Sequence, residues 1–458
     1  MTLAVLLAGA MLLAACSSGS SSSGSAAAQP ASTSSASSTS GTSSTSTAAA
    51  ATANDAGITA TQIRIAVIAD VATAVQPGLF QKSVNAVQAW ASIVNANGGL
   101  AGRQIAVDVC DSKLDPNATT NCVIKACQDD FAMVGTAALA LTDLSDIDTC
   151  KNAQGQAAGL PNLAGIAFPP LICDKNTWVV TGTGSYCATA KDNPQTYTLP
   201  VGDYRYYATH FQGLHGIWVY DGDVPSARIT QVPGFQIGSN LGIKKDGQGF
   251  YTSSDSAPQS ALTPTVQVLK RDAATFAFNG SSPYNMVQER KEAALQGVST
   301  VKVWACNSGC YDSSFLAAGG AAVNGTYMPI TNLPFYSEYK DNPSLSALIS
   351  KLGGTSNLNN NALASYIAAL LFQDAVTKAV ANGGTLSRQT LTAALNSEHS
   401  FNAQGIIGPA DVAARTPSNC DVIMEVVNGA FQRVYPTKPG TFDCNPGNVG
   451  TIKMNENG

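Results

Sequence analysis

The sequence has few charged residues and few histidines, and these shortages exclude several function classes. Asp, Glu, Lys and Arg make up 12% of the 458 residues, the formal net charge is −5, and only three histidines occur. Because no basic patch stands out, we expect no nucleic-acid partner. A Gly-x-Ser-x-Gly elbow, a His-Glu-x-x-His motif and a Walker A loop are also absent from the sequence. We therefore expect no enzyme activity, no cofactor and no metal.

Positive charge is missing from the N-terminal part of the chain, where Arg64 is the first basic residue. The apolar run Leu3–Ala15 is shorter than the roughly 20 residues of a membrane-spanning helix, and it fits the core of a signal peptide over residues 1–15. It ends in Leu-Ala-Ala-Cys, which resembles a bacterial lipobox with Cys16 as the lipidated residue. Because a positive n-region is lacking, we expect the true start codon to lie upstream.

A long segment of Ser, Ala, Thr and Gly follows Cys16 and carries no charge until Asp55. Such a composition cannot bury enough apolar surface to offset its ordering entropy. We expect residues 16–54 to form a tether with an end-to-end distance of about 30–35 Å. The chain would then be extracytoplasmic and anchored to the cell membrane by lipid.

Eleven cysteines occur, and Cys16 leaves an even ten for disulfides, as in exported proteins. Their spacing is unlike that of zinc sites. Spacing alone favours three pairs: Cys306–Cys310, Cys173–Cys187 and Cys420–Cys444.

Apolar runs alternate with helical patterns along the chain from residue 62. "QIRIAVIAD" (62–70) indicates a buried strand, and a helix follows that ends at Gly98 and Gly99. A second strand precedes a helix with Asp115 as N-cap and Pro116 in its first turn. A further βα series covers 215–306, and Asn428-Gly429 indicates a hairpin turn. This order predicts doubly wound α/β lobes with parallel sheets, whereas the stretch 173–200 reads as irregular.

The first lobe is expected to have a strand order that begins 2-1-3. Right-handed crossovers then place its second and third helices on one face of the sheet. This arrangement brings together two more cysteine pairs, Cys110–Cys122 and Cys127–Cys150, each with Cα atoms within about 7 Å.

The order of these elements resembles the type I periplasmic binding proteins, in particular the branched-chain amino-acid (Leu/Ile/Val) receptors of ABC importers. The segment "NANGGLAGRQI" (95–105) is similar to that family's Asn-x-x-Gly-Gly-x-x-Gly-Arg-x-Ile, and Asp111, Pro116 and Gly135 continue the likeness. The resemblance implies two lobes joined by a hinge. Expected lobe one comprises 55–198 plus 328–415, and lobe two comprises 199–327 plus 416–458.

By position, the resemblance implies ligand-binding residues in loops of both lobes. For lobe one these residues are Thr136, Leu141, Thr142, Ala167 and Phe168. For lobe two they are Tyr220, Asp221, Asp223, Asn279, Ser281, Tyr284, Asn307 and Tyr311. The loop "GTAALALTDL" is more apolar than in amino-acid receptors, and Asp221, Asp223 and Asp312 are the candidates to face an amine. The ligand can therefore equally be an amino acid or a less polar solute, such as an aromatic or short-chain acid, an amide or a sterol-like fragment.

The resemblance implies a monomeric receptor that closes on a small organic solute and delivers it to an ABC permease. A sensing module for a membrane signalling partner would share the same fold. An exported hydrolase is the third alternative, and a reduced cysteine near His210 or His215 would favour it.

Overall fold

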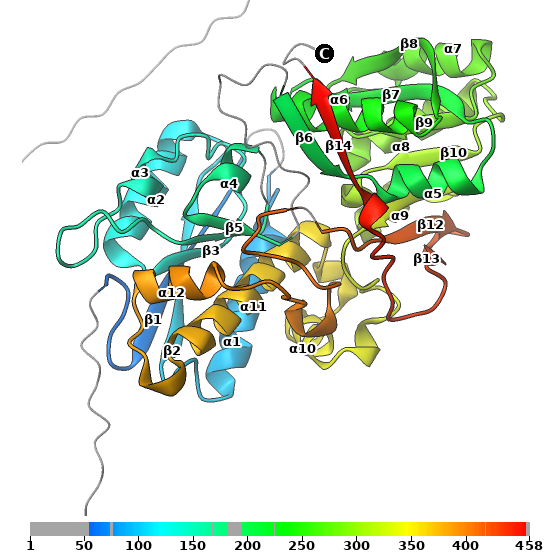
Figure 1. The fold of residues 1–458 in the computed structure, drawn as a ribbon. Helices are drawn as coiled ribbons and strands as arrows, with labels where there is room; N and C mark the ends of the chain where they lie inside the picture. The colour runs from blue at the N-terminus through cyan, green and yellow to red at the C-terminus, as the bar shows by residue number, and fades with distance from the viewer. Residues whose placement is uncertain are drawn as a thin grey trace, which may run out of the picture. The chain divides into compact units, whose positions relative to one another are not determined.

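The computed structural model describes residues 55–73, 77–166, 169–180, 195–223, 225–416 and 418–454. These residues form two larger sheets, each covered by helices, and a third sheet of two strands (Figure 1). We call the first sheet with its helices lobe one and the second sheet with its helices lobe two. Ala167, Phe168 and Cys187, which the sequence analysis named, lie outside the described residues.

Lobe one contains a five-stranded parallel sheet in the order β2-β1-β3-β4-β5, which confirms the predicted 2-1-3 start. Its strands are β1 (Gln62–Ala69), β2 (Gln104–Asp111), β3 (Ala132–Thr136), β4 (Asn162–Ala164) and β5 (Thr177–Val179). The inner strand β1 is buried along most of its length, as its continuous apolar run predicts.

Helices cover both faces of this sheet. Their bounds are α1 (Gln81–Ala96), α2 (Pro116–Asp129), α3 (Ser145–Asp148), α4 (Pro169–Cys173), α10 (Pro343–Leu352), α11 (Asn360–Ala379) and α12 (Arg388–Leu395). Figure 1 shows α1, α11 and α12 on one side of the sheet and α2 and α3 on the other. Because Trp90 of α1 packs edge-on against Phe372 of α11, two helices far apart in sequence share one core.

The predicted ends of two helices, the start of α2 and the end of α1, are confirmed. Asp115 accepts a hydrogen bond from the Ala118 N–H and so caps α2. Gly98 and Gly99 follow α1 with φ of +96° and +86°, the left-handed region that glycine adopts without strain.

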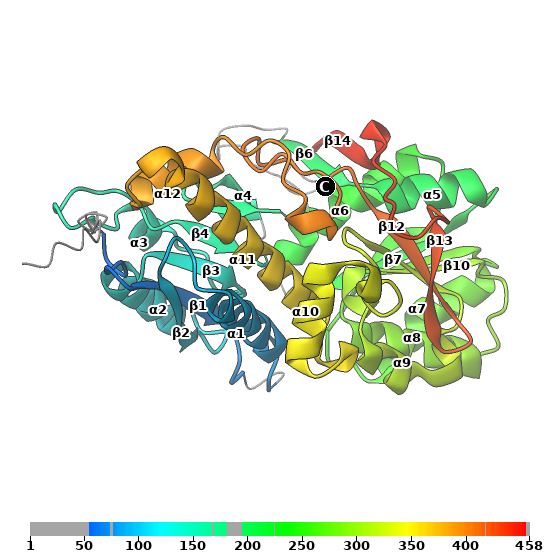
Figure 2. The ribbon, with the colours of Figure 1, turned by 90° about the horizontal axis from the view of Figure 1, so that it is seen from below.

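Lobe two contains a seven-stranded sheet in the order β13-β12-β11-β10-β9-β7-β8. Its strands are β7 (His215–Asp221), β8 (Lys244–Ser253), β9 (Phe276–Asn279), β10 (Val303–Cys306), β11 (Thr326–Ile330), β12 (Val422–Val427) and β13 (Ala430–Tyr435). Its helices are α5 (Gly202–His210), α6 (Pro225–Asn240), α7 (Thr263–Arg271), α8 (Pro283–Leu295) and α9 (Ser313–Gly319). In Figure 2 the β12–β13 hairpin lies beside the strands of lobe two.

Strand β11 extends the second sheet beyond residue 327, where the first segment of lobe two was expected to end. Residues 326–330 form β11, which pairs with β10 and β12 and is buried apart from half-buried Pro329. The stretch 173–200, read as irregular, includes β5 and also β6 (Gln195–Pro200). Strand β6 pairs antiparallel with β14 (Val449–Met454) over six residues, a contact that local patterns do not encode.

Four of the five predicted disulfides are present: Cys110–Cys122, Cys127–Cys150, Cys306–Cys310 and Cys420–Cys444. The fifth prediction, Cys173–Cys187, involves a residue outside the described ranges. Within the described ranges, no helix is both long and apolar enough to cross a membrane.

Candidate solute site at the strand ends

Asp70 organises the carboxyl edge of the lobe-one sheet. This residue follows β1 and is fully buried. Its Oδ1 accepts hydrogen bonds from the Ser112 hydroxyl (2.6 Å) and the Leu114 N–H (2.8 Å), and its Oδ2 accepts one from the Leu139 N–H (2.7 Å). One carboxylate thus holds together the loops that follow β1, β2 and β3.

Asp111 adds a second set of contacts at the same edge. Its side chain accepts hydrogen bonds from the backbone N–H groups of Val71, Ala72 and Lys113, each 3.0 Å long. Partial burial opposes the charge of this carboxyl, but the three donors outweigh that effect and lower the pKa of Asp111. The segment after β1 is therefore fastened to the end of β2.

The lobe-one residues predicted to contact a ligand lie in different surroundings. Thr136 is buried and donates its hydroxyl proton to Asn162 Oδ1 (2.8 Å), within the sheet. Leu141 packs in a hydrophobic cluster of lobe one, whereas Thr142 is exposed. The structure does not bring these three side chains together.

At the carboxyl edge of lobe two, polar side chains connect successive loops. Asp223, after β7, accepts hydrogen bonds from the Ser254 hydroxyl (2.6 Å) and the Asp255 N–H (3.1 Å), after β8. Asp255 Oδ1 in turn accepts one from the Ser281 hydroxyl (2.8 Å), after β9. Three neighbouring loops are therefore held in one network.

Asn279 and Asn285 extend this network into the interior. Asn279 Nδ2 donates to Asn285 Oδ1 (2.9 Å) and Glu289 Oε2 (2.7 Å), while its Oδ1 accepts the Ser281 N–H (3.1 Å). Asn285 Nδ2 donates to the Ser253 hydroxyl (2.7 Å). Burial raises the pKa of Glu289 to about 7, although the hydrogen bond from Asn279 acts in the opposite direction.

Asn307 fastens the loop after β10 to the loop after β9. Its Nδ2 donates to the carbonyl oxygens of Gly280 (3.0 Å) and Ser281 (3.2 Å), and its Oδ1 accepts the Gly309 N–H (2.9 Å). These hydrogen bonds fix the conformation of the two loops. Asn307 is therefore a residue that positions the loops.

The remaining predicted residues of lobe two differ in exposure. Tyr220 stacks on Phe250 with ring centroids 4.4 Å apart, and buried Asp221 accepts the Asp223 N–H (2.7 Å). Tyr284, which the resemblance implies as a ligand-binding residue, is 49% exposed at the start of α8.

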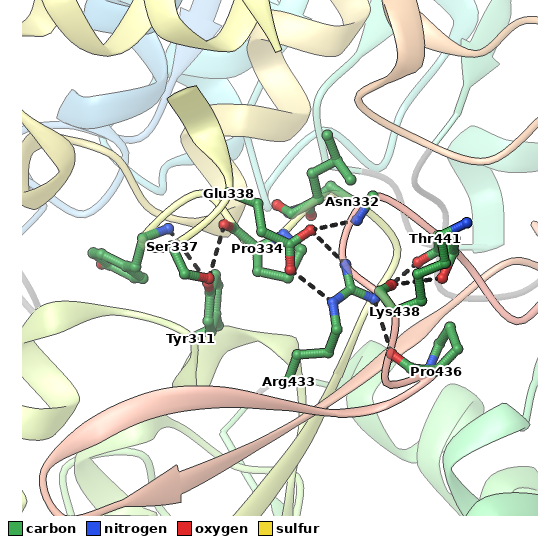
Figure 3. Close-up of polar contacts among 12 residues, drawn as sticks. Tyr311, Asn332, Pro334, Ser337, Glu338, Arg433, Pro436, Lys438 and Thr441 are labelled. Carbon is green, nitrogen blue, oxygen red and sulfur yellow. Dashed lines mark hydrogen bonds and ion pairs between the residues drawn. The ribbon is translucent and has the colours of Figure 1, made fainter. Parts of the chain in front are cut away.

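Tyr311 is enclosed by aromatic rings from other segments. It is fully buried against Phe335, Tyr336 and Phe431, with centroid distances from 4.6 to 5.1 Å. Figure 3 shows Tyr311 next to Pro334, Ser337 and Glu338 of the segment that leaves β11. Its surroundings are those of a core residue at the junction of the lobes.

Asp312 connects the lobes by charge. It caps α9 through the Ser314 N–H, and its Oδ2 lies 3.4 Å from Lys82 Nζ of α1. Asp312 therefore has a cationic partner in Lys82, whereas Asp221 accepts a hydrogen bond from the Asp223 N–H and Asp223 accepts one from the Ser254 hydroxyl. None of the three carboxylates needs a ligand amine to satisfy it.

The structure thus unites Asp223, Asn279, Ser281 and Asn307 in one network, with Asp221 hydrogen-bonded to Asp223. Sequence reasoning missed five members of the network and two residues of the lobe-one edge: Ser253, Ser254, Asp255, Asn285, Glu289, Asp70 and Ser112. For Asp70, Ser112, Ser253, Ser254 and Asp255 a signal was present, because these residues lie at or just after the carboxyl ends of strands. Asn285 and Glu289 gave no such signal, since they lie within helix α8.

Comparison with known proteins gives the family. A model of the periplasmic binding protein family matches residues 62–190 and 240–430, well over half of the chain. The chain belongs to this family. A search of curated proteins found no match.

Solved structures share the fold of this periplasmic binding protein at low identity. A fatty acid ABC transporter substrate-binding protein from Thermomonospora curvata is 18% identical with a TM-score of 0.64, covering 85% of this chain and 98% of its own. A leucine-binding protein LivK from Thermotoga maritima is 14% identical with a TM-score of 0.61, covering 81% and 97%. A branched-chain amino acid ABC transporter protein from Thermus thermophilus, with bound valine, is 14% identical with a TM-score of 0.65, covering 84% and 97%.

Proposed function

We propose that this protein is a lipid-anchored extracytoplasmic receptor that binds a small organic solute and delivers it to an ABC importer. The observation that carries the proposal is the pair of polar carboxyl edges, one organised by Asp70 and one by the Asp223–Ser254–Asp255–Ser281 network. Ligands of open α/β sheets bind at such edges. A solute held by both edges would favour a closed arrangement that a permease can distinguish.

We infer that the solute is less polar than a free amino acid. Binding an α-carboxylate and an α-amine requires uncommitted donors and acceptors, because burying an unpaired charge is costly. The Thr136 hydroxyl already donates a hydrogen bond to Asn162, and Asp312 is already paired with Lys82. An aromatic or short-chain acid, an amide or a sterol-like fragment fits these surroundings better than a zwitterion.

The surroundings of the histidines support a binding role over catalysis. His215 pairs with Asp246, His399 pairs with Asp411, and His210 stacks on Tyr206. The described cysteines are disulfide-bonded. Within the described ranges, no thiol is available to form a nucleophile–base pair with any of these imidazoles. We propose that no bond of the solute is made or broken.

The anchor belongs to the same proposal. Lipid on Cys16 and the uncharged segment after it would keep the receptor near its permease while the folded part stays movable. Feeding cells a labelled fatty acid should label the wild-type protein, and Cys16→Ser should lose the label and release the protein from membranes. Retention of the label in Cys16→Ser would contradict the anchor without affecting the binding proposal.

Solute binding is tested by thermal unfolding of a soluble form that begins at Asp55, with amino acids, amides, aromatic and fatty acids, and sugars. A solute at 100 times its dissociation constant adds about 2.7 kcal/mol of stability. We expect a shift for one weakly polar class, its loss in Ser281→Ala, and recovery of the solute unchanged by mass spectrometry. A product would indicate an enzyme, and zwitterionic amino acids as the only ligands would contradict the solute class.

A further inference from the structure

Arg388 is a fully buried arginine, and the one carboxylate hydrogen-bonded to it among the described residues, Asp55, accepts its backbone N–H. Arg388 begins α12, and its guanidinium donates hydrogen bonds to four backbone carbonyls and one sulfur. The acceptors are Phe131 O (3.1 Å), Lys151 O (3.2 Å), Cys127 O (3.1 Å), Asp130 O (2.6 Å) and Cys150 Sγ (2.9 Å). The sulfur belongs to the Cys127–Cys150 disulfide.

The positive charge of Arg388 is stabilised mainly by the dipoles of the backbone carbonyls to which the guanidinium donates. Asp55 accepts the backbone N–H of Arg388 (2.6 Å) and acts on the guanidinium only at longer range. Burial, together with the nearby Asp108, raises the pKa of Asp130 to about 7, so this second carboxyl supplies a reduced negative charge. A buried cation in this situation stabilises any anion that forms beside it.

We propose that Cys127–Cys150 is a thiol–disulfide exchange site for a dithiol, with Arg388 stabilising the thiolate that leaves from Cys150. The geometry gives the two sulfurs different roles. Cys127 is partly exposed, whereas Cys150 is 3% exposed and lies against the guanidinium. An incoming thiolate therefore reaches Cys127, and the developing charge falls on Cys150.

The exchange proceeds in two balanced steps. One thiolate of the dithiol attacks Cys127 Sγ and forms a mixed disulfide, the Cys127–Cys150 bond breaks, and its electron pair stays on Cys150 Sγ as a thiolate. The second thiol of the reagent, after losing its proton to solvent, then attacks the reagent sulfur of the mixed disulfide and expels Cys127 as a thiolate. The reagent is oxidised to a disulfide, and the protein gains two cysteine thiols. Reversal by an oxidised dithiol restores the bridge.

Cys110–Cys122 is a matched bridge in the same molecule. It also has one cysteine in helix α2, the 3% exposed Cys122, and joins it to a partly exposed residue, Cys110 of β2. No guanidinium in the described residues donates a hydrogen bond to either of its sulfurs. Lower basicity of the leaving thiol speeds exchange, so the two bridges should differ in rate because of Arg388.

The test treats the folded protein with dithiothreitol at pH 7, quenches it with an alkylating reagent and follows each bridge by peptide mass spectrometry. We expect Cys127–Cys150 to open about tenfold faster than Cys110–Cys122 or more. With a monothiol, the trapped mixed disulfide should be on Cys127. Equal rates, a slower Cys127–Cys150, or trapping on Cys150 would each overturn the proposal.

A second measurement distinguishes an exchange site from a structural bridge that is merely accessible. Titration of the selectively reduced protein by thiolate absorbance should show one thiol with a pKa well below the ordinary value of about 8.5. Arg388→Lys should retain part of the rate advantage, and Arg388→Met should remove it. The comparison of bridges in the wild-type protein decides the question even if Arg388→Met does not fold.

Discussion

Arg433 and Glu338 form a bidentate ion pair with almost no solvent exposure. Arg433 Nε lies 2.6 Å from Glu338 Oε1, and Nη2 lies 2.7 Å from Oε2 (Figure 3). The Gly440 N–H adds a third donor to the carboxylate, and Arg433 also donates to the Thr441 carbonyl. The pair joins the segment after β11 to the hairpin strand β13 and the loop that follows it.

Arg433→Met should therefore destabilise the fold severely. Removing the guanidinium leaves the Glu338 carboxylate buried and unpaired, which costs about 3–5 kcal/mol. The double variant Glu338→Leu/Arg433→Met should regain much of this loss. Urea unfolding of the soluble protein measures both. Arg271→Met, at the exposed Arg271–Asp272 pair, is the control and should change stability by less than about 0.5 kcal/mol. Similar losses in the two single variants would contradict the prediction.

Asp203 and Asp421 should make stability fall as pH rises. Burial raises the pKa of Asp203 to about 7 and, together with the nearby charge of Asp203, raises that of Asp421 to about 8. Carboxyls with a folded pKa above the unfolded value bind more protons in the folded state. Their full contribution to the free energy of unfolding is present below a pH of about 4, and it declines as the pH rises to about 8.

Asp421→Asn should therefore raise Tm at pH 8 by more than at pH 5, because the substitution removes a charge that the folded state disfavours. The expected gain in unfolding free energy at pH 8 is about 2 kcal/mol or more. Calorimetry of both proteins across this range measures the difference. An unchanged slope of Tm against pH would show that Asp421 is not the responsible group.

Gly135 should tolerate alanine less well than Gly98 does. Its φ is +74°, and an added Cβ would lie 2.5 Å from Val87 Cγ2 and 3.2 Å from Ser365 Cβ. We expect Gly135→Ala to cost about 2–4 kcal/mol through strain and overpacking between β3 and its helices. Gly98→Ala, at φ +96° with open space around it, should cost about 1 kcal/mol. If urea unfolding gave the same loss of stability for Gly135→Ala and Gly98→Ala, the loss would come from the positive φ alone and not from overpacking.

Asn307→Ala should weaken solute binding more than it weakens the fold. The side chain holds the Gly280 and Ser281 carbonyls, so its loss frees the loop after β9. We expect about a tenfold loss of solute affinity and a loss of about 1 kcal/mol in stability. Asn357→Ala, which removes a donor to the Leu352 carbonyl in lobe one, should leave affinity unchanged. Calorimetric titration with the solute found by thermal shift measures the affinity of each variant. Equal affinities in Asn307→Ala and Asn357→Ala would show that Asn307 does not support solute binding.

Local patterns predicted a large part of the fold. The apolar run of β1, the Asp115 cap of α2 and the Asn428-Gly429 turn each act over a few residues, so the sequence around them suffices. The four described disulfides followed because strand order and spacing restrict which cysteines can meet. The pairing of β6 with β14 could not be predicted in this way, since its partners are separated by most of lobe two and half of lobe one.

The sequence predicted which loops form the candidate site but not the contacts of the individual side chains within it. Parallel strands bring their carboxyl ends to one edge, which identified Asp223, Asn279 and Ser281. The hydrogen bonds of Glu289 depend on how α8 rests on the sheet. The enclosure of Tyr311 depends on rings from segments that follow it in the chain. Neither arrangement leaves a local trace in the sequence.

Strands β12 and β14 are synthesised long after β11 and β6, the strands that they pair with. Until residues beyond Asp421 have left the ribosome, β11 is an open edge and β6 has no antiparallel partner. A growing chain therefore stays incompletely folded until these last strands have been made. A chain truncated before Val422 would keep the bare apolar edge of β11, and bare edges of this kind pair with other chains and aggregate.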